Sequence, residues 1–270
     1  MNQVFILCVW VVLAYMTGVF LLALVLKDNS IVDVAWGPGF ILVAVLSLAL
    51  GPGVGRRPWL VVALVVVWGT RLAVHILVRR KGKGEDFRYA QWRRAWGRAF
   101  VLRSFGQVFL LQGVFLLIIS TPVILINASA VPRLGVWDAL GAAVWVLGFV
   151  FEAGGDIQLE LFKMKEENKG RIMTSGLWRY TRHPNYFGEA AMWWGIFIMA
   201  LSVPKGWLSL VSPALITFLL TKVSGVPMLE KKYAGRPEFA AYARRTSAFI
   251  PWFPKRDRRL GTPSDPSPGR

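Results

Sequence analysis

The sequence predicts an all-α, polytopic integral membrane protein, a helical bundle of about seven transmembrane helices. Hydrophobic residues make up 55% of the 270 residues and include 13 Trp and 17 Phe, more apolar surface than a soluble domain of this size needs. These residues also gather in runs that approach the roughly 20 residues with which a helix crosses a bilayer. Composition and run length together therefore favour a membrane-embedded chain.

Seven runs qualify as candidate spans. They are Val4–Leu26, Ile31–Leu50, Pro58–Val78, Phe105–Ile126, Val136–Phe151, Tyr186–Val203 and Trp207–Val223. The first has no charged residue, and its length and the lack of a basic segment before it favour a membrane span over a cleaved signal peptide. The fifth and sixth runs are short, so their ends are the least defined.

We interpret residues 1–256 as a single membrane domain. A four-span N-terminal half, residues 1–135, precedes a C-terminal half, residues 136–256, which holds most of the candidate chemistry. The tail, residues 257–270, is rich in Pro and Ser, and this composition predicts disorder.

The net charge of +17 is unevenly distributed. Basic residues crowd three blocks, 79–103, 163–182 and 231–270. Because Lys and Arg mark cytoplasmic loops, we predict an N-terminus outside and a C-terminus in the cytoplasm, with Arg56 and Arg57 as exceptions. Loops that flank spans explain these charges more simply than nucleic-acid binding does. We therefore expect membrane lipids as partners and no nucleic acid.

Ionisable residues in the N-terminal half are the first functional candidates, since such groups are costly inside a membrane. Asp33 lies two residues into the second run, where a helix N-cap is the alternative role. Arg71 and His75 are four residues apart and share a helix face. Arg71 would pair with a carboxylate, either Asp33 or Glu152, in a structural or a catalytic ion pair.

The richest polar stretch runs from Gly176 to Glu189. Pro184 suits the first turn of a helix, and the positive end of that helix beside Arg182 is suited to bind phosphate. His183 directly precedes this proline. Asn185 and Glu189, four residues apart, share one face of the helix that follows.

A second polar face lies on the helix that leaves the fifth span. Glu152, Asp156, Glu160 and Lys163 follow one another at helical spacing, so they form either a binding face for ribose and phosphate or a self-paired surface. The turn that ends at Arg171 adds cations. Two histidines and one cysteine do not support a metal site, and no glycine-rich nucleotide motif is present.

Several motifs together resemble one known family. They are Ile31-Val-Asp-Val-Ala-Trp-Gly37, Trp68-Gly-Thr-Arg-Leu-Ala-Val-His75, Gly84-Glu-Asp-Phe-Arg-Tyr89, Asn168-Lys-Gly170, the stretch from Gly176 to Gly195, Ser224-Gly-Val-Pro-Met-Leu-Glu230 and Ala248-Phe-Ile-Pro-Trp252. The pattern resembles bacterial membrane proteins related to steroid 5-alpha-reductase, long catalogued as a domain of unknown function. The resemblance implies a multi-pass protein of the bacterial inner membrane.

The wider superfamily includes steroid and sterol reductases that use NADPH to reduce carbon–carbon double bonds. By resemblance, the cofactor binds in a cytoplasm-facing cavity walled by the last three spans. Asp156 matches an acidic residue near the cofactor, Lys163 replaces an arginine, and Arg171 matches a phosphate-side arginine. Asn185 and Glu189 match an Asn-x-x-Gly-Glu motif. Arg182 and His183, beside the same helix start, complete the predicted cofactor site.

The chain departs from the animal steroid reductases in its predicted substrate half. Those enzymes use a Gln-Glu pair in the second span and a Tyr in the third to hold and protonate an enone. Here the second span offers Asp33, and Ile76 stands at the tyrosine position. The candidate catalytic residues are therefore Asp33, His75 and Tyr89, any of which would stabilise or protonate the developing enolate.

Three functions follow as hypotheses. The first is an NADPH-dependent reductase of a lipophilic substrate, such as a steroid-like, isoprenoid or other lipid. The second is an S-adenosylmethionine-dependent membrane methyltransferase resembling isoprenylcysteine carboxyl methyltransferase, which also carries Arg-His-Pro and a later Glu and Tyr pattern, here Glu230, Tyr233 and Tyr242. The third is a non-enzymatic lipid-binding protein. The cations around Arg171 favour the reductase, because S-adenosylmethionine carries no phosphate.

Overall fold

The computed structural model describes residues 2–255, and the tail predicted to be disordered, residues 257–270, lies outside them. Within residues 2–255 the regular structure is helical, apart from one isolated β-bridge between Thr181 and Ser247. The α-helices are α1 (Asn2–Leu26), α2 (Ile31–Leu50), α3 (Arg56–Arg80), α4 (Phe87–Trp96), α5 (Phe100–Ser104), α6 (Leu111–Ile119), α7 (Thr121–Asn127), α8 (Val136–Met164), α9 (Pro184–Ala200), α10 (Val211–Phe218), α11 (Val226–Tyr233) and α12 (Pro237–Arg245). The prediction of an all-α fold is confirmed.

Six helical segments in this described part of the chain are long and apolar enough to cross a membrane. They are Gln3–Leu26, Ile31–Leu50, Arg56–Arg80, Phe87–Ile119, Val136–Met164 and Gly206–Tyr233. This confirms a multi-pass membrane protein by length and composition. The expected run Tyr186–Val203 corresponds to α9, which has only 17 residues. A seventh span and the orientation of the termini stay predictions.

The chain divides into two compact units. Among the described residues, the first unit comprises the chain from residue 2 to Val146 together with Ala191–Thr217, and the second comprises Leu147–Ala190 and residues 218–255. The boundaries fall inside α8, α9 and α10. Each unit therefore gathers segments that are distant in sequence. The single domain predicted for residues 1–256 and its division after residue 135 stay predictions.

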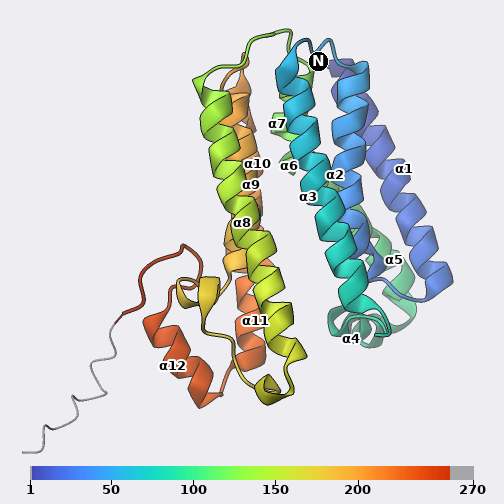
Figure 1. The fold of residues 1–270 in the computed structure, drawn as a ribbon. Coiled ribbons are helices and arrows are strands. Elements are labelled where there is room, and N and C mark those ends of the chain that lie inside the picture. Colours follow the sequence, from blue (N-terminus) through green and yellow to red (C-terminus); the bar gives the residue numbers. More distant parts are fainter. Residues whose placement is uncertain (1, 256–270) are drawn as a thin grey trace, which may run out of the picture. The chain divides into compact units, whose positions relative to one another are not determined.

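In the first unit, α1, α2 and α3 run side by side (Figure 1). The backbones of α2 and α3 approach closely at Gly37 and Gly69. A Cβ atom added to Gly37 would lie only 2.2 Å from the carbonyl oxygen of Gly69, so the contact has no room for a side chain. Small residues allow such contact between membrane helices. Beside it, Phe40, Trp68 and Trp193 form an aromatic cluster with ring centroids 4.8–5.3 Å apart. Close glycine contact and aromatic packing thus form the core of this unit.

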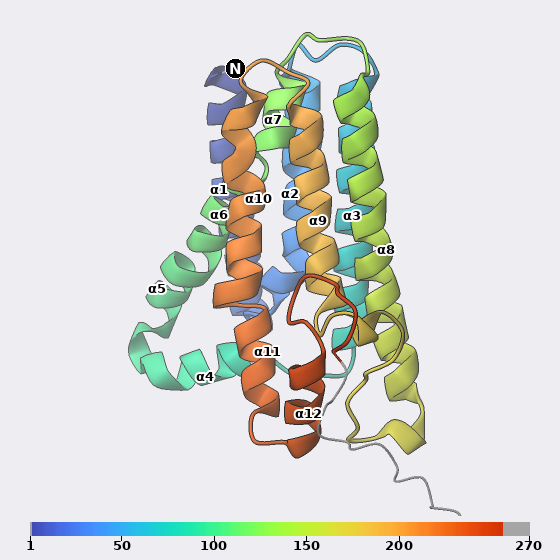
Figure 2. The same cartoon turned by 90° about the vertical axis from the view of Figure 1, so that its left-hand side faces the viewer.

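The segment from α4 to α6 is less regular than the sequence predicted. The apolar run was expected to form a helix over Phe105–Ile126, whereas helical structure begins at Phe87 and the continuous segment ends at Ile119. A π-helical turn, η2 (Phe105–Leu110), lies between α5 and α6. Figure 2 shows α4 lying across the direction of α6. The chain changes course at the end of α4, where Gly97 adopts a φ of 49° and a 3-10 turn, Gly97–Ala99, leads into α5. Length and composition count Phe87–Ile119 as one candidate span, and α4 is its differently directed first part.

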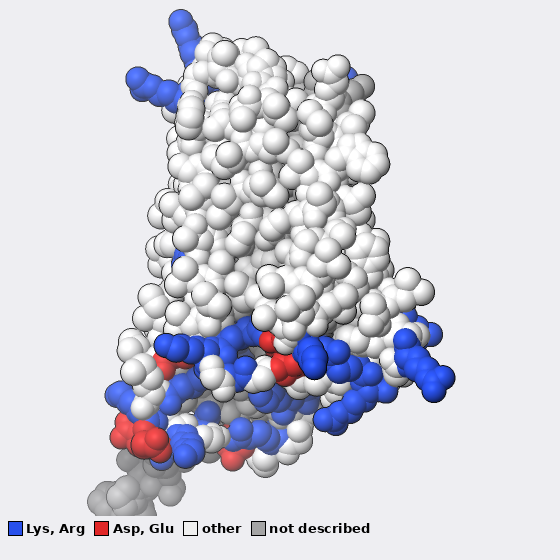
Figure 3. All heavy atoms as spheres, turned by 90° about the vertical axis from the view of Figure 1, so that its right-hand side faces the viewer, with Lys and Arg blue, Asp and Glu red and all other residues white. Residues whose placement is uncertain are grey.

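The outer face of α1 is apolar. Trp10 is 62% exposed and Leu21 is 55% exposed, although a soluble protein would bury side chains of this size. Figure 3 views the molecule from the side on which Figure 1 draws α1. It shows a broad zone almost without charged side chains, with most Lys, Arg, Asp and Glu side chains below it and further Lys or Arg side chains at its upper edge. This distribution is typical of a lipid-facing surface with a polar boundary.

A buried ion pair ties α3 to the start of α8 in the first unit. The Nε of Arg57 donates to the Oδ1 of Asp138 at 2.7 Å, and each residue is only 2% exposed. Arg57 also donates to the carbonyl oxygen of Val131 at 2.9 Å. Of the two predicted exceptions to the charge pattern, Arg57 is thereby accounted for, because its charge is neutralised inside the protein. Arg56 is exposed.

We predict that Arg57→Gln strongly destabilises the protein. The substitution leaves the carboxylate of Asp138 buried without its cation, which costs about 3–5 kcal/mol of unfolding free energy. Thermal unfolding in detergent micelles measures the change. The matched control is Arg56→Gln, which alters the adjacent exposed residue. Equal unfolding midpoints for the two variants would show that the buried pair does not stabilise the fold.

Candidate functional site

The candidate cofactor site lies within the second unit, where α8 and α9 pack closely. A Cβ on Gly188 would lie 2.4 Å from the carbonyl oxygen of Gly148 and 2.8 Å from the Cβ of Glu152. One turn further along, a Cβ on Gly155 would lie 3.0 Å from Pro184. These contacts require residues without side chains. They bring the polar face of α8 against the first turns of α9.

Asp156 and Asn185 meet at this contact. The Nδ2 of Asn185 donates to the Oδ1 of Asp156 at 3.1 Å, and Asp156 is 6% exposed. The Oδ1 of Asn185 is buried and has no hydrogen-bond partner among residues 2–255. A buried acceptor of this kind costs free energy unless something donates to it. The pair therefore has an acceptor available for a ligand that carries an N–H or O–H group.

Arg182 has a different role from the one the sequence suggested. Its Nε and Nη2 contact the Oε1 of Glu230 in α11 at 2.8 Å and 2.7 Å. Its Nη1 donates to the carbonyl oxygens of Ala243 and Thr246 at the end of α12. The guanidinium is thus occupied by the protein itself. A contact between Arg182 and a cofactor stays a prediction.

His183 is buried next to the same carboxylate. Its Nε2 lies 3.3 Å from the Oε1 of Glu230, and its ring stacks on Tyr186 with centroids 5.6 Å apart. Burial lowers the pKa of His183 below its ordinary value, although Glu230 opposes that shift. When the neutral imidazole of His183 donates from Nε2, its Nδ1 is a hydrogen-bond acceptor. This Nδ1 is buried and has no hydrogen-bond partner in the described chain. Two buried acceptors therefore lie at the start of α9.

The C-terminal segment holds this helix start in place. The hydroxyl of Tyr242 donates to the carbonyl oxygen of Trp178, and the Nε1 of Trp178 donates to that of Gly155 at 3.0 Å. Burial raises the pKa of Tyr242, so it remains a neutral donor. Thr181 donates to the carbonyl oxygen of Phe249 at 2.8 Å. The contact between Thr181 and Phe249 holds the Ala248–Trp252 motif against the Gly176–Glu189 stretch.

The other predicted cofactor residues lie nearer the surface of the second unit. Glu189 is half-buried on α9, whereas Lys163 and Arg171 are exposed. The Nζ of Lys163 lies 3.9 Å from the Oε1 of Glu160. This is one of the ion pairs within α8 that the helical spacing of these residues predicted. Arg171 forms no ion pair within residues 2–255, and its exposed guanidinium is available to an anion. The structure thus brings Asp156 to Asn185 and joins Arg182 to His183 through Glu230.

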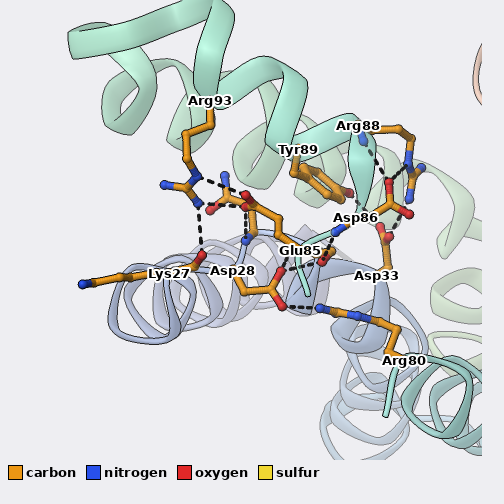
Figure 4. Close-up of polar contacts among 11 residues, drawn as sticks. Lys27, Asp28, Asp33, Arg80, Glu85, Asp86, Arg88, Tyr89 and Arg93 are labelled. Atoms are coloured by element: carbon orange, nitrogen blue, oxygen red, sulfur yellow. Dashed lines mark hydrogen bonds and ion pairs between the residues drawn. The ribbon is translucent and has the colours of Figure 1, made fainter. Parts of the chain in front are cut away.

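The first unit contains a separate polar cluster built around Asp33 (Figure 4). The hydroxyl of Tyr89 donates to its Oδ1 at 2.7 Å, and Arg88 contacts its Oδ2 at 2.7 Å. Asp86 is the N-cap of α4 and accepts from the backbone N–H of Arg88 at 3.0 Å. Burial raises the pKa of Asp86, but the stronger combined effect of its hydrogen bonds with Arg88 lowers it overall.

Two of the three predicted catalytic residues, Asp33 and Tyr89, are therefore in direct contact. His75 lies half-buried on α3, and its part in this cluster stays a prediction. The sequence alone does not indicate Arg88 as the partner of Asp33, although Arg88 lies within the Gly84–Tyr89 motif. Nor does it place Glu230 beside Arg182 and His183, because that contact arises only in the fold. Among residues 2–255, no three His, Cys, Asp or Glu side chains converge on a possible metal site.

Comparison with known families gives one clear result. A family model described as "Protein of unknown function (DUF1295)" matches residues 19–246. The chain belongs to this DUF1295 family. It is also similar to "Uncharacterized protein C594.04c" of the fission yeast Schizosaccharomyces pombe, with 24% identity over 199 residues. That similarity covers 64% of this chain and 57% of the yeast protein, so the chain spans little more than half of that relative's length. No solved structure matches the chain.

We predict that His183 titrates below its ordinary pKa of 6.5, because burial disfavours the imidazolium. The unfolded chain then takes up this proton first as pH falls. The stability contributed by His183 is therefore fully present above pH 6.5 and declines below it. Histidine NMR measures this pKa directly, since His75→Gln leaves one histidine in a chain that has two.

Glu230→Gln in the same background should lower the pKa of His183 further, because it removes the charge that favours the imidazolium. A pKa for His183 at or above 6.5 contradicts the burial argument. A rise in that pKa on Glu230→Gln contradicts the assigned contact.

Proposed function

We propose that this DUF1295 protein is a membrane-embedded, NADPH-dependent reductase that reduces a carbon–carbon double bond of a lipophilic substrate by hydride transfer. The observation that carries the proposal is the pair of buried acceptors at the start of α9, Asn185 Oδ1 and His183 Nδ1, next to Asp156. A ligand with ribose hydroxyls and an amide N–H supplies the donors that these atoms lack. The relation to steroid and sterol reductases, drawn from the motifs, is part of the same proposal.

The residues of the second unit fit such a cofactor. Asp156 accepts a hydroxyl or amide hydrogen, and the nearby Asn185 and His183 accept two more. Arg171 and Lys163 are exposed cations of the same unit that would hold the phosphates, with Arg171 the stronger candidate for a bidentate contact. When bound, NADPH supplies the hydride. The protein's part is to orient the cofactor and keep water away from it.

The reaction also consumes a proton, and two of the candidate donors from the sequence, Asp33 and Tyr89, form the cluster of the first unit. Tyr89 is a buried hydroxyl donor held at 2.7 Å from the carboxylate of Asp33. Arg88 stabilises that carboxylate from its other oxygen. We keep Tyr89 as the candidate proton donor: its one hydroxyl hydrogen, now donated to Asp33, would turn to the substrate, while Asp33 positions the ring. Tyr89 would thereby take the role of the tyrosine that the steroid reductases carry at the position of Ile76. His75 is the alternative donor.

One structural observation keeps a second function in consideration. Arg182 and His183 both contact Glu230, so the Arg-His-Pro motif and the later Glu that resemble isoprenylcysteine carboxyl methyltransferase meet in space. An S-adenosylmethionine-dependent methyltransferase would use the same helix start. That ligand also carries hydroxyl and amine donors but no phosphate. The exposed cation of Arg171 supports our choice of the dinucleotide.

We predict that NADPH, and not S-adenosylmethionine, raises the unfolding temperature of the purified protein. A ligand that binds only the folded state at 100 times its dissociation constant adds about 2.7 kcal/mol of stability. Thermal unfolding in detergent, recorded with each ligand in turn, measures the effect. Stabilisation by S-adenosylmethionine alone would establish the methyltransferase alternative, and stabilisation by neither ligand would contradict both.

We predict that Arg171→Ala weakens NADPH binding by about ten-fold, the equivalent of one charge-assisted hydrogen bond. NADH binding should change much less, because NADH lacks the 2′-phosphate. The matched control is Arg244→Ala, which removes an equally exposed arginine from α12 of the same unit. Equal losses of NADPH and NADH affinity would remove the proposed phosphate role from Arg171.

A further inference from the structure

A groove on the first unit borders the polar cluster around Asp33, but none of the candidate residues of either polar site lines it. It has a volume of about 460 Å³ and lies between the start of α2 and the end of α3. Its lining consists of Ile31, Val34, Leu77, Val78, Arg80 and Lys81. Because α2 begins at Ile31 and α3 ends at Arg80, the groove lies where two spans end. In a bilayer this is the level at which acyl chains meet headgroups.

The two ends of the groove differ in chemistry. Leu77 and Val78 are 58% and 67% exposed, so a large apolar surface faces outward along the span. Lys81 follows directly after the end of α3 and is exposed as well. The groove therefore presents an apolar wall that ends in cations, which is the arrangement that an amphiphilic anion requires.

The carboxylates around the groove are already neutralised by arginines. The ion pairs are Arg80–Asp28, Arg93–Glu85, Arg88–Asp33 and Arg88–Asp86 (Figure 4). By contrast, Lys81 and Lys83 are exposed and form no ion pair within residues 2–255. The remaining charge at the mouth of the groove is therefore positive. Arg80 is also held in place by Asp28, so its position does not depend on a ligand.

We propose that this groove binds an anionic phospholipid, with an acyl chain along Ile31, Val34, Leu77 and Val78 and the headgroup phosphate at Lys81 and Arg80. Juxtamembrane cations attract anionic headgroups, and the apolar wall adds the hydrophobic contribution of the acyl chain. Free phosphate has the same charge but leaves the apolar wall without a partner. The groove therefore selects a lipid over a soluble anion, and it does so independently of the proposed reductase activity.

Native mass spectrometry of the protein, equilibrated with equal amounts of phosphatidylglycerol and phosphatidylcholine, tests the proposal. We expect the wild-type protein to retain phosphatidylglycerol preferentially. Lys81→Gln should reduce this preference by about five-fold, the effect of one cation near a charged headgroup. The matched control Lys232→Gln, an exposed lysine of α11, should leave the preference unchanged.

Filling the groove provides a second variant that does not alter charge. Val78→Trp places a large side chain at a position that is already exposed, so the fold should tolerate it, and it should reduce the retention of both lipids. Excess inorganic phosphate should not displace the bound lipid. The proposal is overturned if the wild-type protein retains the two lipids equally, or if Lys81→Gln and Lys232→Gln give the same lipid preference. Unchanged lipid retention by Val78→Trp, or displacement of the lipid by phosphate, would also overturn it.

Discussion

The guanidinium of Arg182 connects three segments of the second unit that are far apart in sequence. From the start of α9 it contacts Glu230 of α11 and the backbone carbonyl groups at the end of α12. A largely buried charge is costly unless it is fully paired, so these segments must remain together for Arg182 to be satisfied. The same arrangement fixes His183 and Asn185, and the proposed cofactor site depends on their position.

Sequence periodicity and run length predicted much of the membrane architecture. The run Ile31–Leu50 coincides with α2, and Val4–Leu26 differs from α1 only at its N-terminal end, because uninterrupted apolar runs leave few alternatives. Pro184 begins α9 as expected of a proline at a first helical turn. The run Phe105–Ile126 was the poorest match. Its helix starts earlier in a polar segment and includes a π-helical turn that no hydropathy pattern reveals.

The polar clusters were only partly predictable, since their partners are distant in sequence. Asp33 was recognised as a functional candidate, but its contacts come from Arg88 and Tyr89, 55 and 56 positions further along the chain. Arg182 was expected to bind phosphate from its local surroundings. Its actual partner, Glu230, lies 48 positions away, and local charge and helix geometry give no information about that contact. Helical spacing identified the faces, whereas tertiary packing decided the pairs.

The proposed cofactor site requires that the two buried acceptors at the start of α9 contact a ligand. A structure determined with NADPH bound tests this claim most directly. We expect donor groups of the cofactor within hydrogen-bonding distance of Asn185 Oδ1 and His183 Nδ1, with a phosphate close to Arg171. A cofactor bound elsewhere, or a bound complex in which both acceptors still lack a donor, would contradict it.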